Sequence, residues 1–197
     1  MMKKRILPIA ILILISASGA FSQTIEQQAA KIRQLYADTN KRIDEGLKDK
    51  TSGFHYAAWT VGGERDGQQW AAVGTMKTLD EFWFYGEPGF DEEKTADARK
   101  MIRKIVSAYA GAADLRTRSE YLFDEAGEFV FAFTSELEAD KKTTERRFYF
   151  NKGKLIRVIR SGKNIDAKFS AEDLEKAESE REAAKRLQNL FALMFAE

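Results

Sequence analysis

The feature that most constrains this fold is a hairpin pattern that occurs twice between Ser119 and Arg160. The first copy reads SEYLFDEAGEFVFAF and the second reads RRFYFNKGKLIRVIR. In each copy, alternating aromatic residues lead into a short polar turn with a Gly, and alternating apolar residues follow. The two copies align Phe123 with Phe150, Gly127 with Gly153, and Phe129 with Leu155. A period of two is typical of strands and a Gly is typical of a hairpin turn, so the pattern predicts two antiparallel hairpins.

Strand alternation also predicts which side chains of the first hairpin share a face, because successive side chains of a strand point to opposite sides of a sheet. We expect Phe129, Phe131 and Phe133 on one face. Val130 and Ala132 are expected on the other. Both faces then carry apolar residues, which indicates a sheet that is covered on one face and partly covered on the other.

Three further strands are expected before this region. Period-two alternation runs through FHYAAWTV and QQWAAVGTM, which begin at Phe54 and Gln68. The turn-forming residues from Gly62 to Gly67 lie between them and fit a hairpin loop. A third aromatic strand covers about Glu81 to Tyr85. It ends at Gly86-Glu87-Pro88-Gly89, where Gly and Pro make continuation of a strand unfavourable.

Two helices are expected in the first half of the chain. The first runs from Thr24 to about Lys48, because Thr24 and Gln27 have capping-box spacing and apolar residues recur every three or four positions. The second opens at Asp91, where acidic residues complement a helix N-terminus. Its expected buried stripe has helical spacing and consists of Ala98, Met101, Ile102, Ile105 and Tyr109. The opposite face is interpreted as solvated surface, with an anion site as the alternative, and carries Arg99, Lys100, Arg103 and Lys104.

The last helix begins at Ser170, with Asp173 in capping-box spacing. Its first half is densely charged, so we expect that half to run through solvent. Its second half contains the apolar run from Leu187 to Phe195 and is expected to dock on the sheet. Because this half is apolar nearly all round, a homodimer or partner contact through it is the alternative.

Together these patterns predict an α+β fold. We expect a single antiparallel sheet of about seven strands with an inserted helix and flanking N- and C-terminal helices. A curved sheet of this kind leaves a concave face that suits a ligand.

Residues 1–22 have the layout of a secretory signal peptide. Basic residues precede an apolar run from Ile6 to Ile15, and small residues Ala20 and Ser22 precede a cut at Gln23. A membrane anchor is the alternative, but the run is shorter than the ~20 residues that span a bilayer. We therefore expect residues 23–197 to form a single periplasmic or secreted domain with no membrane span after cleavage.

Composition excludes several classes of function. The chain has no Cys, which excludes disulfides, thiol catalysis and zinc sites with Cys ligands. His55 is the only His, which excludes a His-rich metal site, and we expect neither a metal nor a cofactor. The net charge of +1 stays near zero once the basic N-terminal residues are removed, so electrostatics give no reason to expect nucleic acid.

No complete catalytic motif occurs in the sequence. There is no phosphate-binding Gly-rich loop before a helix and no nucleophile elbow. His55 with a carboxylate is a candidate general base, although a single His in a strand is more often hydrogen-bonded or exposed. Acidic residues at 80–81, 91–93 and 124–125 lie in turns or at helix starts, where capping and solubility explain them better than glycoside hydrolysis.

Aromatic residues of the first three strands are the strongest candidate for a binding surface. Trp59, Trp70 and Trp83 fall on successive expected strands, and exposed Trp faces stack on flat ligands such as sugar rings. The simpler interpretation is that these residues fill the core beneath the helices. His55 shares strand parity with Trp59, so the candidate ligand-binding residues are Trp59, Trp70, Trp83 and His55.

The two hairpins, EYLFDEAGEFVF and RRFYFNKGKLIRVI, resemble a segment of uncharacterised exported bacterial α+β proteins. In that family a tyrosine-rich strand, a D-x-x-G turn and a Y-F-x-x-G-K-L-I-R strand recur. The segment is also similar to the Y-D-x-x-G hairpins of tandem surface repeats, although this chain has two units and no array. The resemblance covers Arg118 to Arg160. It implies export and an antiparallel sheet, and it brings no activity or site residue.

The function expected from the sequence is an exported soluble binding or interaction module without catalytic activity, with an unknown ligand or protein as its partner. Two alternatives stay open. One is a small hydrolase or isomerase that uses His55 and a carboxylate. The other is a structural or assembly partner that acts through the C-terminal helix.

Overall fold

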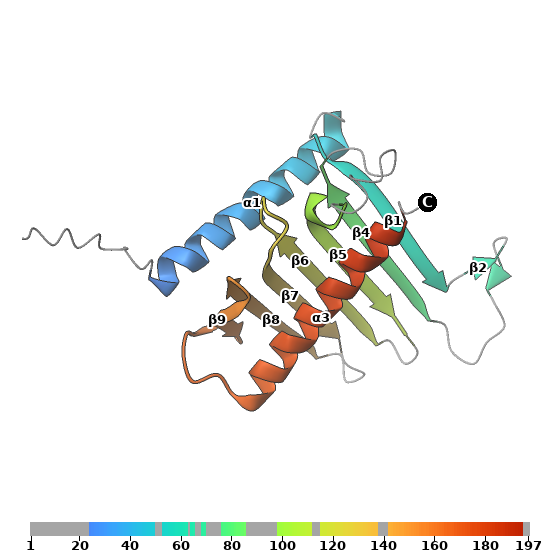
Figure 1. The fold of residues 1–197 in the computed structure, drawn as a ribbon. Coiled ribbons are helices and arrows are strands. Elements are labelled where there is room, and N and C mark those ends of the chain that lie inside the picture. The colour runs from blue at the N-terminus through green and yellow to red at the C-terminus, as the bar shows by residue number, and fades with distance from the viewer. Residues whose placement is uncertain are drawn as a thin grey trace, which may run out of the picture.

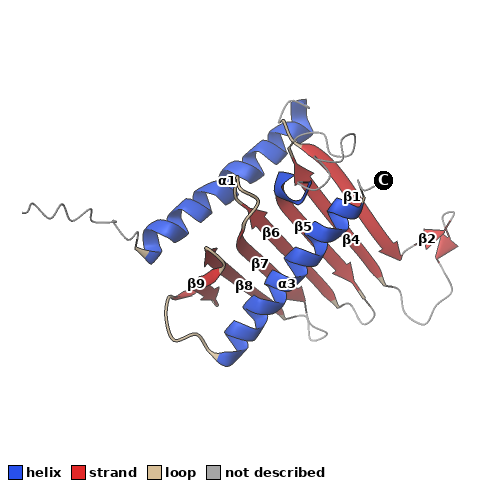
Figure 2. Ribbon diagram, viewed as in Figure 1, coloured by secondary structure: helices blue, strands red, loops and turns tan. Residues whose placement is uncertain are grey.

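The computed structural model describes residues 24–49, 53–62, 64–65, 68–69, 76–85, 98–111, 115–137 and 142–194. These residues form one antiparallel sheet of eight strands with a long helix on each side, so the predicted α+β fold is confirmed (Figures 1 and 2). The predicted signal peptide, residues 1–22, lies outside the described residues. None of the described helices combines the length and the apolar character that a membrane span needs.

Helix α1 spans Ile25–Asp49 and helix α3 spans Ala171–Leu193. Within the main sheet, each strand lies beside the next sheet strand along the chain. The sheet strands are β1 (His55–Gly62), β4 (Lys77–Phe84), β5 (Ile102–Ala110), β6 (Arg116–Phe123), β7 (Phe129–Leu137), β8 (Thr143–Asn151), β9 (Lys154–Arg160) and β10 (Lys163–Ile165). Two short strands, β2 (Glu64–Arg65) and β3 (Gln68–Gln69), pair with each other in a separate ladder.

The two predicted hairpins are confirmed as β6–β7 and β8–β9. In the β6–β7 turn, Asp124 Oδ1 accepts hydrogen bonds from the amides of Ala126 and Glu128, each at 2.9 Å. Gly127 follows with a φ of 79°, and a Cβ at this position would lie 2.6 Å from the Cα of Lys100. Only Gly combines this φ with such a close approach, which explains the Gly at this turn.

The predicted pairing of FHYAAWTV with QQWAAVGTM is wrong. Strand β1 pairs with β4 along its whole length, and the turn-forming residues make the β2–β3 ladder as an insertion between them. Residues 70–75 lie outside the described residues. Gly62 permits the pairing with β4, because a Cβ there would lie 2.0 Å from the carbonyl oxygen of Met76.

Three strand pairs share a β-bulge at the same end of the sheet. The register shifts at the last core residue of β4, β6 and β8, namely Phe84, Phe123 and Phe150. Each partner strand then contains one unpaired residue, namely Arg103, Val130 and Ile156. An extra residue brings side chains that are three positions apart onto one face. The pairs that share the core beneath α3 are Ile102 with Ile105, Phe129 with Ala132, and Leu155 with Val158.

The bulge in β5 explains why the predicted second helix is too long. Residues 98–101 are helical, but Ile102–Ala110 is a strand. Ile102 and Ile105 imitate a helical stripe because the unpaired Arg103 lies between them. The predicted solvated position of Lys104 is also wrong, since its side chain is buried and bonds to helix α1.

The bulge in β7 separates three Phe residues that we expected on one face. Phe129 belongs to the core beneath α3, whereas Phe131 and Phe133 belong to the core beneath α1. Val130 lies on the α1 side together with Phe131 and Phe133, although simple alternation would place it on the opposite face. Alternation fails here because one inserted residue reverses the parity of everything before it.

Helix α1 covers one face of the sheet close to the bulges. Its N-terminus has the predicted capping box, in which the amides of Thr24 and Gln27 donate to each other's side chains at 3.1 and 3.2 Å. Ala29 and Ile32 are buried on the side of the helix that faces the sheet. They pack against one residue from each of three central strands, namely Leu122, Phe131 and Tyr149.

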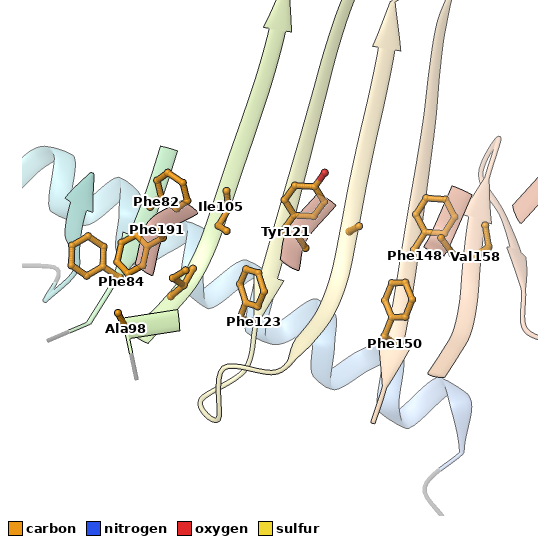
Figure 3. Close-up of a cluster of buried hydrophobic side chains, with 14 residues drawn as sticks. Phe82, Phe84, Ala98, Ile105, Tyr121, Phe123, Phe148, Phe150, Val158 and Phe191 are labelled. Carbon is orange, nitrogen blue, oxygen red and sulfur yellow. The ribbon is translucent and has the colours of Figure 1, made fainter. Parts of the chain in front are cut away.

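Helix α3 covers the opposite face and crosses the strands diagonally (Figure 1). Its buried residues recur at helical spacing and are Asp173, Ala177, Glu180, Ala184 and Phe191. The two Ala residues let the helix approach the sheet closely. Near its end, the ring of Phe191 packs against those of Phe82 and Phe84 at centroid distances of 5.4 and 4.8 Å (Figure 3).

The prediction that the first half of α3 runs through solvent is wrong. Glu180 is buried and accepts hydrogen bonds from the hydroxyls of Tyr121 at 2.9 Å and Ser119 at 3.3 Å. Lys176 lies beside it and pairs with both Glu180 and Glu136 of β7. These charged side chains have partners on the sheet, so the charged part of α3 packs against the sheet and does not run through solvent.

The apolar second half of α3 docks on the sheet as predicted. Phe191 is fully buried, and Leu187 and Leu190 pack against the same core. Leu193 points away and is 70% exposed. A homodimer through this half, the alternative suggested by its composition, stays a prediction.

Replacing Phe191 with Ala is expected to lower the free energy of unfolding by roughly 3–5 kcal/mol, because it leaves a cavity between the helix and the aromatic residues of β4. Leu193→Ala, two positions away on the exposed side, is expected to change it by less than about 0.5 kcal/mol. Urea denaturation followed by circular dichroism measures both. Equal effects of the two substitutions would contradict the docking of α3.

Candidate functional site

The α1 face of the sheet contains a groove of about 430 Å³ that the helix leaves open. Figure 1 shows α1 across one end of the strands, while the other strand ends extend beyond it. Two neighbouring transverse rows of side chains line the groove. The inner row is Leu79, Ala108, Arg118 and Ser135. The outer row is Lys77, Ala110, Arg116 and Leu137.

Strand register places both rows on the α1 side. Directly opposite residues of antiparallel strands point to the same face, so all members of a row share one side of the sheet. Arg118 shares its strand parity with Glu120, and Glu120 bonds to a side chain of α1. The groove therefore continues the surface on which α1 lies.

The groove is hollow because its floor residues are short. Ala108 and Ala110 lie on β5, between the longer side chains of β4 and those of Arg118 and Arg116 on β6. The apolar lining residues are these two Ala residues with Leu79 on β4 and Leu137 on β7. These four side chains form an apolar floor. No described helix covers it, so the floor stays accessible from solvent.

A buried ionic network forms the wall between the groove and helix α1. Lys104 Nζ lies 2.7 Å from Glu120 Oε2 and donates to Asn40 Oδ1 at 2.6 Å. Glu120 also accepts a 2.6 Å hydrogen bond from the Tyr36 hydroxyl and a 3.0 Å hydrogen bond from Arg118 Nε. Lys104 and Glu120 are both more than nine-tenths buried, and the network satisfies each of them.

The network keeps Glu120 ionised. Burial by itself raises the pKa of this carboxyl, but the charge and hydrogen bond of Lys104 and the hydroxyl of Tyr36 outweigh burial, so the pKa lies below its usual range. Burial lowers the pKa of Lys104, and the charge of Glu120 opposes that effect only in part. Burial and the bond to Glu120 raise the pKa of Tyr36 to about 12. Through its bonds to Arg118, Glu120 holds the guanidinium of that residue beside the groove.

The four candidate ligand-binding residues do not form one surface. Trp59 stands opposite Asp80 on the α3 side, where it is 42% exposed. Trp83 stands opposite Tyr56 on the α1 side, with a ring centroid distance of 5.5 Å between the two. Trp70 lies outside the described residues. Ligand binding by any of them stays a prediction, but the structure does not bring Trp59 and Trp83 together.

His55 lies on the α3 side with Trp59, as strand parity predicted. Its ring stacks on that of Phe84 at a centroid distance of 5.5 Å. Among the described residues, no carboxylate forms a hydrogen bond or ion pair with it. The hydrolase or isomerase alternative therefore rests on His55 alone.

The acidic residues that the sequence offered as candidate catalytic carboxylates are not arranged as a pair in the described structure. Asp80 and Glu81 are neighbours in strand β4 and point to opposite faces. Asp124 is occupied by the turn hydrogen bonds of the β6–β7 hairpin. Residues 91–93 lie outside the described residues. In the part of the chain that the structure describes, no group of three or more His, Asp and Glu residues is arranged for a metal ion.

Sequence reasoning missed the groove because it assigned Ala108 and its neighbours to a helix. Once residues 102–110 are recognised as a strand, three alternating patterns become visible: Lys77-x-Leu79, Ala108-x-Ala110 and Arg116-x-Arg118. Short residues in the central strand, with long ones on both sides, are the signal that could have revealed a hollow.

Strand β1 is a second exposed feature. It lies at one edge of the sheet, and its eight residues include neither a charged residue nor Pro. Tyr56, Trp59 and Val61 are exposed. The opposite edge, β10, is three residues long and contains Lys163, and short length and charge are the usual protection of a sheet edge. Strand β1 lacks that protection.

Comparisons of the chain with family models, with curated proteins and with solved structures found no match. The expectations about function therefore depend on the residues and geometry described above.

Replacing Glu120 with Gln is expected to destabilise the protein by about 3 kcal/mol at neutral pH, because it leaves the buried ammonium of Lys104 without its counter-charge. Since the folded-state pKa of Glu120 is lowered, its contribution is present above the ordinary Glu value of about 4.3 and is lost as the pH falls through the folded-state pKa. The difference between wild type and Glu120→Gln should therefore shrink in acid.

Urea denaturation at several pH values measures this difference. Glu178→Gln, which breaks an exposed pair with Arg181, is the control and is expected to have little effect. A Glu120→Gln variant as stable as wild type at neutral pH would show that the network is not a structural wall.

Proposed function

We propose that this protein is an exported, non-catalytic binding module that holds a small, largely apolar molecule in the groove on the α1 face. The observation that carries the proposal is the open apolar floor of Leu79, Ala108, Ala110 and Leu137. Its volume lies within the range of small-molecule sites, and such sites are typically concave and apolar with a few polar groups.

Two further observations support the proposal. Among the described residues, the carboxylate beside the groove, Glu120, is held by Lys104, Tyr36 and Arg118, and this arrangement suits a structural role better than that of a general base. The basic and apolar segments of residues 1–22 support export, since they have the order found in a secretory signal peptide.

The neutral apolar dye Nile red provides a test. We expect it to bind the wild-type protein with a rise in fluorescence, and to bind Ala108→Trp at least about tenfold more weakly, because the indole fills the floor. Ala58→Trp is the matched control, because it places the same side chain on the same face of the sheet but on β1, outside the groove. Circular dichroism verifies that both variants fold. Failure of wild type to bind, or equal binding by both variants, would contradict the proposal.

The edge strand β1 favours a second candidate function, which is association with a second copy of the chain. Because the strand has no charge, two copies can pair antiparallel without opposing like charges. A pairing centred on Ala58 places Trp59 opposite Ala57, and Tyr56 opposite Thr60, of the second copy, so each large side chain meets a small one.

Sedimentation velocity over a range of concentrations tests this candidate. A dimer is expected at high concentration and should be lost in Val61→Lys, because a Lys at a sheet edge opposes strand addition. Val61→Thr keeps an uncharged β-branched residue and should still dimerise. A monomer at every concentration would remove this candidate without affecting the groove.

A further inference from the structure

We infer that the ligand of the groove is a monomeric amphipathic anion: an aliphatic chain that ends in a carboxylate or a similar acidic group. This inference rests on the proposed function, because it names the chemical class of the molecule held in the groove. It is argued from the charges at the rim, from the shape of the floor and from a comparison with the other hollows of the protein.

The described charged residues that line the groove are all positive, namely Lys77, Arg116 and Arg118. The nearby carboxylate of Glu120 belongs to the wall. Arg118 is paired with Glu120. Among the described residues, Lys77 and Arg116 have no ion-pair partner, so no described carboxylate competes with a ligand for them.

The three cations lie close together by strand register. Lys77 and Arg116 are in the same row on either side of Ala110, about 10 Å apart at their Cα atoms given the usual spacing of strands. Arg118 is two residues along β6 from Arg116, about 7 Å away. A single acidic group at this corner is within reach of more than one of these flexible side chains. Arg in particular binds carboxylates and phosphates through two parallel hydrogen bonds.

Other hollows in the described structure lack this one-sided charge. The hollow at β8 and β9 contains more cations than carboxylates, but its Arg residues are paired with Glu145, Glu172 and Asp173. The hollow beside α1 contains both Lys31 and Asp124. A third, near the end of α1, contains Arg42 and Glu125. Opposite charges can neutralise each other in those hollows, whereas no described carboxylate pairs with Lys77 or Arg116 of the groove. Of the hollows compared, the groove is therefore the one that favours an anion.

The apolar floor determines the other end of the ligand. Leu79 of β4 lies beside Ala108 of β5, and Leu137 lies on β7, beyond the two Arg residues of β6. None of the apolar side chains of the floor carries a polar atom that needs a hydrogen bond from the ligand. An aliphatic chain suits such a surface, because it buries apolar area without leaving a polar atom unpaired. Charge at the rim and apolar area on the floor together specify an amphiphile.

Three amphiphiles with the same chain and different head groups test the inference: decanoate, decanol and decyltrimethylammonium. Each is titrated against Nile red bound to the full protein at neutral pH, below its critical micelle concentration. Decanoate is expected to displace the dye about tenfold more effectively than decanol, which is a realistic gain from two partly exposed ion pairs. Decyltrimethylammonium is expected to be the weakest.

The double variant Lys77→Gln/Arg116→Gln provides the second arm. It is expected to lose the preference for decanoate while decanol binds as it does to wild type, because the floor is unchanged. Lys163→Gln/Lys185→Gln removes two exposed cations that do not line the groove and should keep the preference. A preference that survives in Lys77→Gln/Arg116→Gln would overturn the assignment of the anion to these two residues.

The outcomes separate this inference from the proposed function. If none of the three amphiphiles displaces the dye, the proposed function fails. If decanol or decyltrimethylammonium matches decanoate, the groove binds apolar molecules and the inferred charge is wrong. Vesicles of anionic phospholipid are tested without the dye, by co-sedimentation with the protein, and should leave the protein in the supernatant because their chains are held in a bilayer. Sedimentation of the protein with vesicles, together with no displacement of the dye by decanoate, would overturn a monomeric ligand in favour of a membrane surface.

Discussion

A sheet with apolar residues on both faces must be covered on both, and this requirement determines the rest of the structure. Two long helices are described, and each covers part of one face. Helix α1 lies on the large side chains around Leu122, Phe131 and Tyr149, and α3 lies on those around Phe82 and Phe191. Beyond these contacts the strands carry short or charged residues. The groove lies where helix α1 no longer covers the sheet but apolar side chains are still present on its surface.

The β-bulges make two-sided cover possible at one end of the sheet. In each of three strand pairs, the unpaired residue lets apolar side chains three positions apart share the α3 side. In β7 and β9 it also adds an apolar residue to the α1 side, namely Val130 and Ile156. The bulges thus concentrate aromatic and aliphatic groups where the helices dock. On the α1 side, the opposite ends of the strands carry Ala, Ser and charged residues together with Leu79 and Leu137.

Charged residues contribute to both helix contacts, and this is why part of the fold could not be predicted. The hairpins, the Thr24 and Ser170 caps and the docking of Phe191 follow from local patterns that tertiary structure did not override. The strand from Ile102 to Ala110 could not be predicted from its local pattern, because a bulged strand and a helix give the same spacing of buried residues. Glu180 and Lys104 were assigned to solvent because a charge in sequence does not reveal a partner distant along the chain. The groove was missed for the same reason, since its residues come from four strands and become neighbours only through register.

The ionic network connects the fold to the candidate site. Glu120 joins Tyr36 of α1 to Arg118 at the groove, so the contact that ends the cover of α1 also orients one of the three rim cations. The most direct test of this account is an NMR titration of the backbone amides with decanoate. The account predicts that the largest chemical-shift changes occur in residues 77–79, 108–110, 116–118 and 135–137. Changes confined to β1 or to the exposed side of α3, or no changes at all, would contradict it.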